Sequence, residues 1–342
     1  MKSLLVTGGA GFIGSSFVHM ALARGARVVV LDSLTYAGHR HSVPTEDARC
    51  RLVVGSITDG PLIAKLLREE HIDSVVCFAA ESHVDRSIDA PSAFIDTNVI
   101  GTFRMLEASL AYWRSLDGDA KLGFRHLQVS TDEVYGSLGD SGKFKEESPY
   151  TPNSPYSASK AAGDHLVRAW HHTYGLPTLT TNCSNNYGPR QHPEKLIPVL
   201  ITKAIAGEPL PIYGHGANVR DWIHVEDHCA GIFLALERGR SGETYCFGGD
   251  AERKNLDVAR QVCATLDELR PRSDGTSYAT QIAFVTDRLG HDWRYAIDDA
   301  RAQKDLGFTR KYGFEDGLRA TIQWYLDNRE WCERALAPRS ST

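Results

Sequence analysis

The stretch that decides the fold is Ser3-Leu-Leu-Val-Thr-Gly-Gly-Ala-Gly-Phe-Ile-Gly14. Its first five residues form a short apolar run, which predicts a buried strand, and residues 15–24 have the apolar spacing of a helix. Between the two elements stand three spaced glycines: Gly8, Gly11 and Gly14. Glycines there let the chain turn tightly and let its backbone approach a pyrophosphate, which the helix N-terminus then faces. The stretch therefore predicts a dinucleotide-binding turn.

A carboxylate follows the next predicted strand, residues 26–31. Asp32 stands at the end of that strand, where it can accept both ribose hydroxyls of NAD and would repel the extra phosphate of NADP. The alternative is a glycine-rich turn followed by a surface aspartate. The strand–turn–helix context favours NAD as the cofactor.

Strand and helix patterns alternate through the first half of the chain, at 52–54, 61–70, 74–78, 91–113 and 126–130. This alternation predicts an α/β fold, a Rossmann-type doubly wound parallel sheet with helices on both faces. Beyond residue 185 Gly, Pro and Asn interrupt the pattern, which indicates a smaller mixed α/β lobe. We expect an NAD-binding domain over 1–184, to which some later segments return, and a substrate-binding lobe over 185–335.

Composition excludes several classes of function. The 342 residues carry 38 Lys+Arg and 43 Asp+Glu, a net charge of −5, which argues against nucleic acid or an anionic membrane as the main partner. The seven cysteines are scattered without metal-ligand or redox spacing, so we expect no metal and a reducing, cytoplasmic compartment. The opening apolar run is too short for a signal peptide.

A tyrosine and a lysine fall one helical turn apart in Tyr156-Ser-Ala-Ser-Lys160. Ser154 and Pro155 precede them as N-cap and first helical residue, so both side chains are expected on one helix face. A neighbouring ammonium, together with a positive nicotinamide, would favour the phenolate and lower the pKa of the phenol, making Tyr156 a base. The alternative is an exposed pair on a helix surface.

Two adjacent carboxyl groups indicate which reaction the site is suited to. Thr131, Asp132 and Glu133 follow the predicted strand 126–130, at the sheet edge where ligands of open parallel sheets bind. Elimination of water needs an acid for the leaving oxygen and a base for the proton on the neighbouring carbon, and two carboxyls in different environments can hold opposite protonation states. The alternative is a solvated Asp-Glu pair at a helix start. The nearby Tyr156 and Lys160 favour catalysis.

These motifs are similar to those of the extended short-chain dehydrogenase/reductase family, and within it of the sugar-nucleotide 4,6-dehydratases. The resemblance covers roughly residues 1–330. The segments that carry it are Thr7–Gly14, Leu34–Gly38, Ala79–Ile88, Ser130–Gly136, Asn182–Pro189, Pro193–Pro198, Arg220–Trp222 and Asp287–Asp292.

The resemblance implies an NAD-dependent hydro-lyase acting on a nucleoside-diphosphate hexose, with dTDP-glucose as the leading substrate. Tyr156, helped by Thr131, would take the proton from the carbon-4 hydroxyl while NAD accepts the hydride. Glu133 would then remove the carbon-5 proton, and Asp132 would protonate the carbon-6 hydroxyl as it leaves. The hydride would return to carbon 6, so NAD is regenerated in each turnover.

The resemblance also implies binding roles. Residues expected to line the cofactor are Gly8, Gly11, Phe12, Ile13, Gly14, Asp32, Ser33, Leu34, Thr35, Ser56, Ile57, Phe78, Ala79, Ala80, Ser82, Thr97, Tyr156, Lys160 and Asn186. Those expected to meet the nucleotide sugar are Ser82, Thr131, Asn185, Lys195, Leu196, Pro211, Ile212, Tyr213, Arg220, Asn255, His291 and Tyr295. Pro211 and Tyr213 could instead pack the second lobe, and Arg220 could form a structural ion pair.

Four positions depart from the family's pattern. Ser56 replaces an aspartate that would contact adenine, and Asp59 could compensate for it. Arg190-Gln191-His192 replaces an aromatic-rich linker, Leu289 a proline and Trp293 an arginine. The last three changes lie on the expected substrate side, so they bear on the preference for nucleotide and sugar.

Other functions stay open at this point. A dehydratase for another nucleotide, a sugar-nucleotide 4-epimerase or decarboxylase, and a non-catalytic NAD-binding regulator share the fold and the glycines. Those epimerases and decarboxylases usually carry small or hydroxyl residues in place of Asp132 and Glu133, and a regulator has no use for Thr131, Tyr156 and Lys160. By analogy with the family, helices 91–113 and 155–172 are expected to form a homodimer interface.

Overall fold

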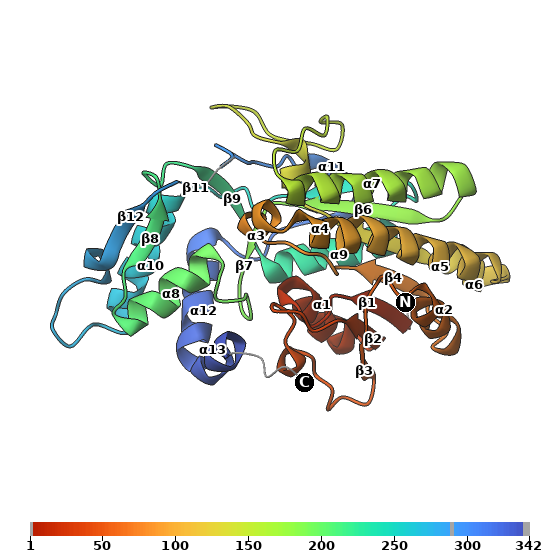
Figure 1. Ribbon diagram of the computed structural model, residues 1–342, viewed down its shortest axis with the longest axis horizontal. Coiled ribbons are helices and arrows are strands. Elements are labelled where there is room, and N and C mark those ends of the chain that lie inside the picture. Colours follow the sequence, from red (N-terminus) through yellow and green to blue (C-terminus); the bar gives the residue numbers. More distant parts are fainter. Residues whose placement is uncertain (1–2, 288–290, 338–342) are drawn as a thin grey trace.

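The computed structural model describes residues 3–287 and 291–337. Leu289 and the tail 338–342, which we expected to fray, lie outside the described residues. Within these two ranges no helix combines the length and the apolar character that crossing a bilayer requires. Figure 1 shows a large α/β unit beside a smaller group of helices and short strands.

The large unit is built on one seven-stranded, all-parallel sheet in the order β10-β6-β5-β4-β1-β2-β3. Its strands are β1 (Ser3–Thr7), β2 (Arg27–Asp32), β3 (Cys50–Val54), β4 (Ser74–Cys77), β5 (Arg125–Val129), β6 (Thr178–Cys183) and β10 (Thr244–Phe247). The strand order reverses at β1 and β4, which places a ligand crevice at their carboxyl ends. The predicted Rossmann-type fold is confirmed. β10 comes from beyond residue 184.

Helices cover both faces of this sheet because its buried strands are apolar on both sides. On one face lie α1 (Phe12–Ala23), α9 (Val225–Arg238) and α11 (Ala300–Leu306). On the other lie α2 (Gly60–Glu69), α5 (Thr102–Arg114) and α7 (Pro155–Tyr174), with the short α6 (Gly118–Gly123) after α5. Along β1 the side chains alternate, so Leu4 and Val6 face the first layer and Leu5 the second.

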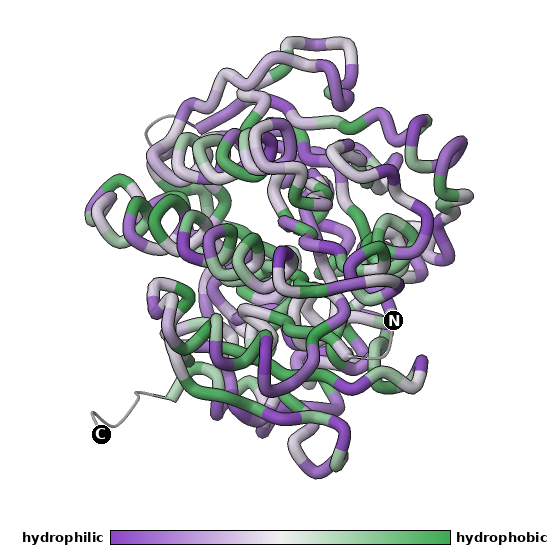
Figure 2. Tube along the Cα trace, turned by 90° about the vertical axis from the view of Figure 1, so that its right-hand side faces the viewer, coloured by the Kyte–Doolittle hydropathy of each residue, from purple (hydrophilic) through white to green (hydrophobic). Residues whose placement is uncertain are grey.

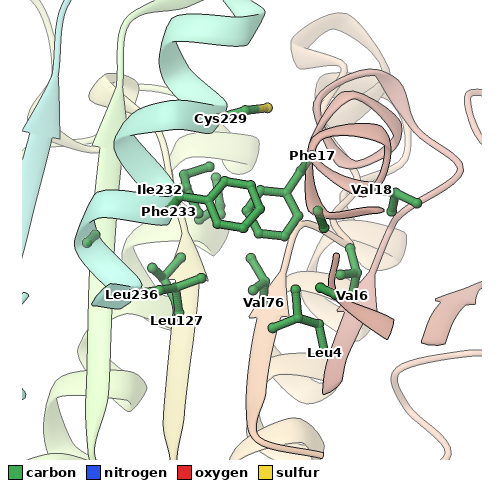
Figure 3. Close-up of a cluster of buried hydrophobic side chains, with 14 of the residues drawn as sticks. Leu4, Val6, Phe17, Val18, Val76, Leu127, Cys229, Ile232, Phe233 and Leu236 are labelled. Atoms are coloured by element: carbon green, nitrogen blue, oxygen red, sulfur yellow. The ribbon is translucent and has the colours of Figure 1, made fainter. Parts of the chain in front are cut away.

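Two stacked phenylalanines join helices that are far apart in the sequence. The rings of Phe17 in α1 and Phe233 in α9 lie 4.3 Å apart, 11° from parallel (Figure 3). Leu127 and Val76 of the sheet lie beneath them in the same cluster. Figure 2 shows hydrophobic segments inside the molecule and hydrophilic stretches mainly in the outer loops. This packing fixes α1, and with it the glycine turn, against the sheet.

The smaller lobe holds its own apolar core between mixed sheets and helices. A three-stranded sheet contains β7 (Asn185–Tyr187), β9 (Val219–His224) and β11 (Glu252–Lys254), and β8 (Leu210–Tyr213) pairs with β12 (Ile282–Val285). Its helices are α8 (Leu196–Ala206), α10 (Asn255–Leu269), α12 (Phe314–Asp327) and α13 (Arg329–Leu336). The predicted smaller mixed lobe is confirmed.

The helix predicted over 91–113 is not uniform. It consists of α4 (Pro91–Phe94), a π-helical segment η2 (Ile95–Gly101) and α5, after the short α3 (Val84–Asp89). Asn98 in η2 accepts a hydrogen bond from the Glu81 backbone N–H (2.9 Å) and donates to Ser159 Oγ (2.8 Å). These tertiary bonds orient the wider turn toward the loop after β4, and π turns are frequent at functional sites. Short 3-10 turns are η1 (Arg40–Ser42), η3 (Asp132–Tyr135) and η4 (Tyr278–Gln281).

Candidate active site

A cavity of about 340 Å³ opens along the carboxyl ends of the central strands. Most of the predicted cofactor and catalytic residues line it: Gly8, Gly11, Phe12, Ile13, Gly14, Asp32, Ser33, Thr35, Ser56, Ile57, Phe78, Ala79, Ala80, Ser82, Thr97, Thr131, Asp132, Glu133, Tyr156, Lys160 and Asn186. Asn185 and Lys195 of the expected substrate set line it too. Leu34 is not among the lining residues, although it follows Asp32 closely.

The glycine turn has no room for side chains. Gly8 has a φ of +69°, and a Cβ on it would lie 2.5 Å from the backbone nitrogen of Ala79. A Cβ on Gly14 would lie 2.2 Å from the carbonyl oxygen of Gly8. Gly11 caps α1 without a side-chain bond, so the helix N-terminus is open to the cavity. These features fit the pyrophosphate of a dinucleotide.

Asp32 is held at the end of β2 by two backbone donors. Its Oδ2 accepts from the Ala10 N–H (2.9 Å) and its Oδ1 from the Leu34 N–H (2.8 Å). The side chain is 8% exposed and lines the cavity. A carboxylate fixed in this way can still accept hydrogen bonds from the hydroxyls of a ribose, so the residues present fit NAD.

The start of α7 places the tyrosine and the lysine as expected. Ser154 caps the helix, and its side chain and that of Ser157 form a reciprocal capping box. Tyr156 and Lys160 are 8% and 5% exposed and point into one cavity. Lys160 Nζ donates to the Val129 carbonyl at the end of β5 (2.8 Å), so the ammonium ties α7 to the strand that precedes Thr131.

The carboxyl groups lie in a tight turn directly after β5. Thr131 caps η3 by accepting the Glu133 backbone N–H, and Thr131 Oγ1 donates to Asp132 Oδ1 (3.3 Å). Asp132 is 2% exposed, and among the described residues its Oδ2 has no hydrogen-bond partner. A carboxyl oxygen that faces a cavity without a hydrogen-bond partner can bond an atom of the substrate.

The pKa shifts in the site favour a protonated Asp132, but by themselves they do not favour an ionised Tyr156. Burial, then the charges of Glu133 and Asp221, raise the pKa of Asp132 well above its usual range, and the Arg220 guanidinium opposes them only in part. This shift favours the protonated form of Asp132, which is the form that an acid needs. Burial, then Glu133, also raise the pKa of Tyr156 well above 10, although a hydrogen bond with Thr131 opposes this. The expected lowering by Lys160 is thus outweighed in the protein alone, because the phenol is dry and beside carboxylates.

A segment that we call the strap, residues 191–195, crosses the outer side of the cavity. Lys195 Nζ donates to the Ser82 carbonyl (3.2 Å), and Glu194 lies 3.7 Å from the Arg86 guanidinium. The His192 ring stacks on His39 with centroids 5.3 Å apart and planes 4° from parallel. The strap therefore bridges the loops that follow β2 and β4.

The remaining expected substrate residues lie outside this cavity, in the small lobe. The Arg220 guanidinium stands 4.4 Å over the Tyr295 ring and donates to the Asp292 and Val219 carbonyls. The Asn255 N–H bonds the Asn218 carbonyl just before β9, and the Tyr295 N–H bonds the Val219 carbonyl in β9. The His291 ring makes an edge contact with Tyr213 of β8. Pro211, Ile212 and Tyr213 are in β8, Leu196 begins α8, and Ile212 is fully packed in the lobe's core.

Two departures from the family's pattern have visible consequences. Ser56 lines the cavity and its hydroxyl bonds Thr58 Oγ1 (2.8 Å). Asp59 does not line the cavity, and its Oδ1 caps α2 by accepting the Leu62 N–H (3.0 Å). Trp293 is 45% exposed, and its backbone N–H donates to Ser137 Oγ.

Several lining residues escaped the sequence analysis: Leu31, Ala37, Gly38, Gly55, Glu81, Val129, Ser130, Cys183, Ser184, Gln191, His192 and Glu194. Most stand next to a predicted residue at a strand end, which is the signal that could have found them. Gln191 and His192 stand in the segment that departs from the family's pattern, and Glu194 stands in the segment Pro193–Pro198. Their contacts with loops far away in the sequence had no local signal.

A parallel sheet with a glycine turn and a buried Tyr–Lys pair defines the class of dinucleotide-binding short-chain dehydrogenase-type enzymes. Residues 5–321 match the family model described as GDP-mannose 4,6 dehydratase, and the chain belongs to this family. It is 57% identical to the dTDP-glucose 4,6-dehydratase of Xanthomonas campestris pv. campestris (strain B100), over 98% of this chain and 96% of that one.

Two further relatives support the same placement. The dTDP-glucose 4,6-dehydratase 1 of Escherichia coli (strain K12) is 49% identical, with 96% of this chain and 94% of that one covered. The crystal structure of the dTDP-glucose 4,6-dehydratase of Streptomyces venezuelae, which contains NAD, superposes with a TM-score of 0.87 at 48% identity. That match covers 97% of this chain and 99% of the other.

Proposed function

We propose that this chain removes water from dTDP-glucose, giving dTDP-4-keto-6-deoxyglucose, with NAD as a cofactor that is regenerated in each turnover. One observation carries this proposal: a buried phenol, an ammonium and two adjacent carboxyl groups line the same cavity as the dinucleotide turn. The relatives named as dTDP-glucose 4,6-dehydratases match almost the whole chain, which supports the choice of sugar nucleotide.

The cofactor end of the cavity is formed by the glycine turn, Asp32 and the loops after β3 and β4. Asp32 would accept the adenosine ribose hydroxyls, and the N-terminus of α1 would hold the pyrophosphate. Bound NAD supplies a reversible hydride acceptor and a positive charge close to the phenol. Lys160 would hold the second ribose while it remains bonded to Val129.

Oxidation at carbon 4 needs a base for the hydroxyl proton. Tyr156 is the base for this step. A hydrogen bond between the Thr131 side chain and the Tyr156 phenol orients the phenol. The pKa of Tyr156 is raised by burial and by Glu133, so the phenol becomes a base only with added positive charge beside it. Lys160 contributes part of that charge from the next turn of α7.

Elimination across carbons 5 and 6 uses the two carboxyl groups in different states. Glu133 would remove the proton from carbon 5, which the neighbouring ketone has made acidic. Burial and Glu133 raise the pKa of Asp132, which favours its protonated form, and Asp132 would deliver its proton to the carbon-6 hydroxyl, which leaves as water. With the hydride returned to carbon 6, a proton would be restored at carbon 5, so the sugar has lost one molecule of water and gained no net oxidation.

Residues of the small lobe would hold the nucleotide. Asn185, which lines the cavity, would meet the diphosphate together with Arg220 and Asn255. Lys195, Pro211 and Tyr213 would surround the nucleobase. Tyr213 and His291, whose rings form an edge contact, would close on the base. In this proposal residues 1–184, completed by β10, bind NAD and residues 185–335 bind the nucleotide sugar.

The helical face of η2, α5 and α7 would pair with a second copy. Partly exposed apolar side chains share this face, among them Ile95 and Ile100, which are 48% and 43% exposed, and the Phe103–Trp170–Tyr174 ring series. A homodimer would bury them. The seven cysteines are all free and buried, which supports a reducing compartment and keeps the cytoplasm as the predicted location.

The test is incubation of the protein with NAD and dTDP-glucose, followed by mass spectrometry. We expect a product lighter by one water with a 4-keto group, and slower turnover with UDP-glucose. Recovery of a galactose-configured nucleotide without loss of water would point to a 4-epimerase and overturn the proposal. Absence of any conversion would also overturn it, provided that NAD binding is demonstrated.

A further inference from the structure

A third charged residue continues the line of Tyr156 and Lys160 along α7. Asp164 lies four residues after Lys160 and is 4% exposed. Side chains at this spacing are neighbours on one helix face, about 5–6 Å apart at their Cβ atoms. Asp164 does not line the cavity, so it cannot contact the substrate.

Asp164 is also bonded to the strand that carries the catalytic turn. Its Oδ2 accepts hydrogen bonds from Ser130 Oγ (2.5 Å) and from the Tyr150 hydroxyl (3.2 Å). Ser130 directly follows Val129, whose carbonyl accepts from Lys160 Nζ. Two consecutive residues at the end of β5 are therefore held by two consecutive turns of α7, immediately before Thr131.

We propose that Asp164 is a positioning residue for the proposed dehydration. Its carboxylate keeps Lys160 in the charged form and, through Ser130, fixes the end of β5 against α7, so that Thr131–Glu133 face Tyr156. This inference rests on the proposed function for its effect on turnover, but the ionisation of Lys160 is a property of the protein alone.

The surroundings leave Asp164 as the charged partner of the ammonium. The titratable groups that face Lys160 are Cys77 of β4, Cys183 of β6 and Asp164 itself. Those that face Asp164 on its other sides are Tyr150, Tyr135 and His165. Burial raises the pKa of the Cys77 thiol to about 12 and that of Cys183 further, so both stay uncharged at neutral pH. Burial raises the pKa of both tyrosines as well, and Cys246 of β10, which adjoins them, is a buried thiol with a raised pKa.

The balance of charges in this cluster is delicate. Burial lowers the pKa of Lys160, and the charge of Asp164 is the largest effect that opposes it. Burial raises the pKa of Asp164 to about 6, against the opposing effects of Lys160, Ser130 and Tyr150. The carboxylate is therefore mostly ionised at neutral pH, and replacing it by a neutral group removes the main support for the ammonium.

The test measures the ionisation of Lys160 by competitive acetylation over a pH series, with peptide mass spectrometry as the readout. In Asp164→Asn, which keeps an oxygen acceptor for Ser130 and Tyr150, we expect the labelling midpoint of Lys160 to fall by about one pH unit or more. We expect kcat for dTDP-glucose to fall by about tenfold or more, because the phenol loses nearby positive charge.

Two matched variants separate charge from structure. Asp164→Glu keeps the carboxylate, so the labelling midpoint should stay at the wild-type value while kcat falls. Ser130→Ala removes one bond that favours the ionised carboxylate, so it should move the midpoint by less than Asp164→Asn does. An unchanged midpoint in Asp164→Asn would overturn the proposal; if that variant fails to fold, a midpoint moved by Asp164→Glu would do so. Because labelling needs no turnover, failure of the proposed dehydration would appear separately, as a wild-type protein that does not convert dTDP-glucose.

Discussion

The two ends of the cavity are held in different ways. At the reaction end, α7 and β5 are joined by buried bonds from Lys160 and Asp164. At the outer end, Gln191 anchors one end of the strap by buried hydrogen bonds with Asn186 and Tyr325. Further along the strap, Glu194 makes only a long ion pair with Arg86, whose side chain is 52% exposed. The difference indicates that the catalytic groups are preorganised, whereas Glu194 can part from Arg86 at low cost.

Removing one oxygen atom at the reaction end should have the largest effect on activity. Tyr156→Phe deletes the proposed base, so kcat should fall by about 10³–10⁴-fold while the Kd for NAD changes little. Steady-state kinetics and NAD titration measure the two. Tyr278→Phe is the matched control, because its hydroxyl is also buried but bonds the Arg270 carbonyl in the small lobe. Equal rates in both variants would contradict the assignment.

The two carboxyl groups should give the next largest effects. Glu133→Gln and Asp132→Asn each remove one proton carrier, and each should lower kcat by about 10²–10³-fold with little change in KM. Glu146→Gln serves as the control, since its carboxylate accepts the Cys246 N–H and does not line the cavity. A change in KM with kcat intact would make Asp132 and Glu133 binding groups instead.

Much of this reaction end could be predicted from the sequence. The glycine turn, the start of α7 and the triplet 131–133 are each specified by residues close together in the chain. Apart from Lys195, the strap could not be predicted, because it depends on contacts between distant segments: His192 stacks on His39, and Glu194 lies 3.7 Å from Arg86. The π-helical η2 was also missed, since its apolar spacing is that of an ordinary helix.

The buried histidine of β5 gives a stability prediction for the reaction end. Burial lowers the pKa of His126 to about 4, and its Nδ1 bonds Ser109 Oγ (2.9 Å). The unfolded chain therefore binds more protons below pH 6.5, and His126 costs stability as the pH falls from 6.5 toward 4, by about 1.4 kcal/mol per pH unit.

Urea unfolding at pH 6.5 and at about pH 5 should show that the wild type loses free energy of unfolding as the pH falls. In His126→Asn this loss of free energy should be smaller by about 1–2 kcal/mol. The exposed His71, whose backbone φ of +46° suits asparagine, provides the control His71→Asn. The same acid sensitivity in His126→Asn as in the wild type would show that this side chain is not the source.

The smallest effect is expected at the strap. Glu194→Gln weakens the ion pair with Arg86, and the Kd for NAD should rise by about fivefold or less at low salt. The difference from the wild type should shrink at high salt, because exposed pairs are screened. Glu268→Gln, which breaks the exposed pair with Arg319 in the small lobe, is the control. A loss of affinity of a hundredfold or more would mean that the strap is as rigid as the reaction end.

The central claim is that Tyr156, Asp132 and Glu133 act on one bound hexose. The most direct measurement is conversion of dTDP-glucose by the wild-type protein in D₂O, with the product analysed at once by mass spectrometry and NMR. We expect one solvent deuterium at carbon 5, because the proton removed there is replaced from solvent-exchangeable groups. We expect no solvent deuterium to be delivered as the hydride to carbon 6. A product without deuterium at carbon 5 would contradict it.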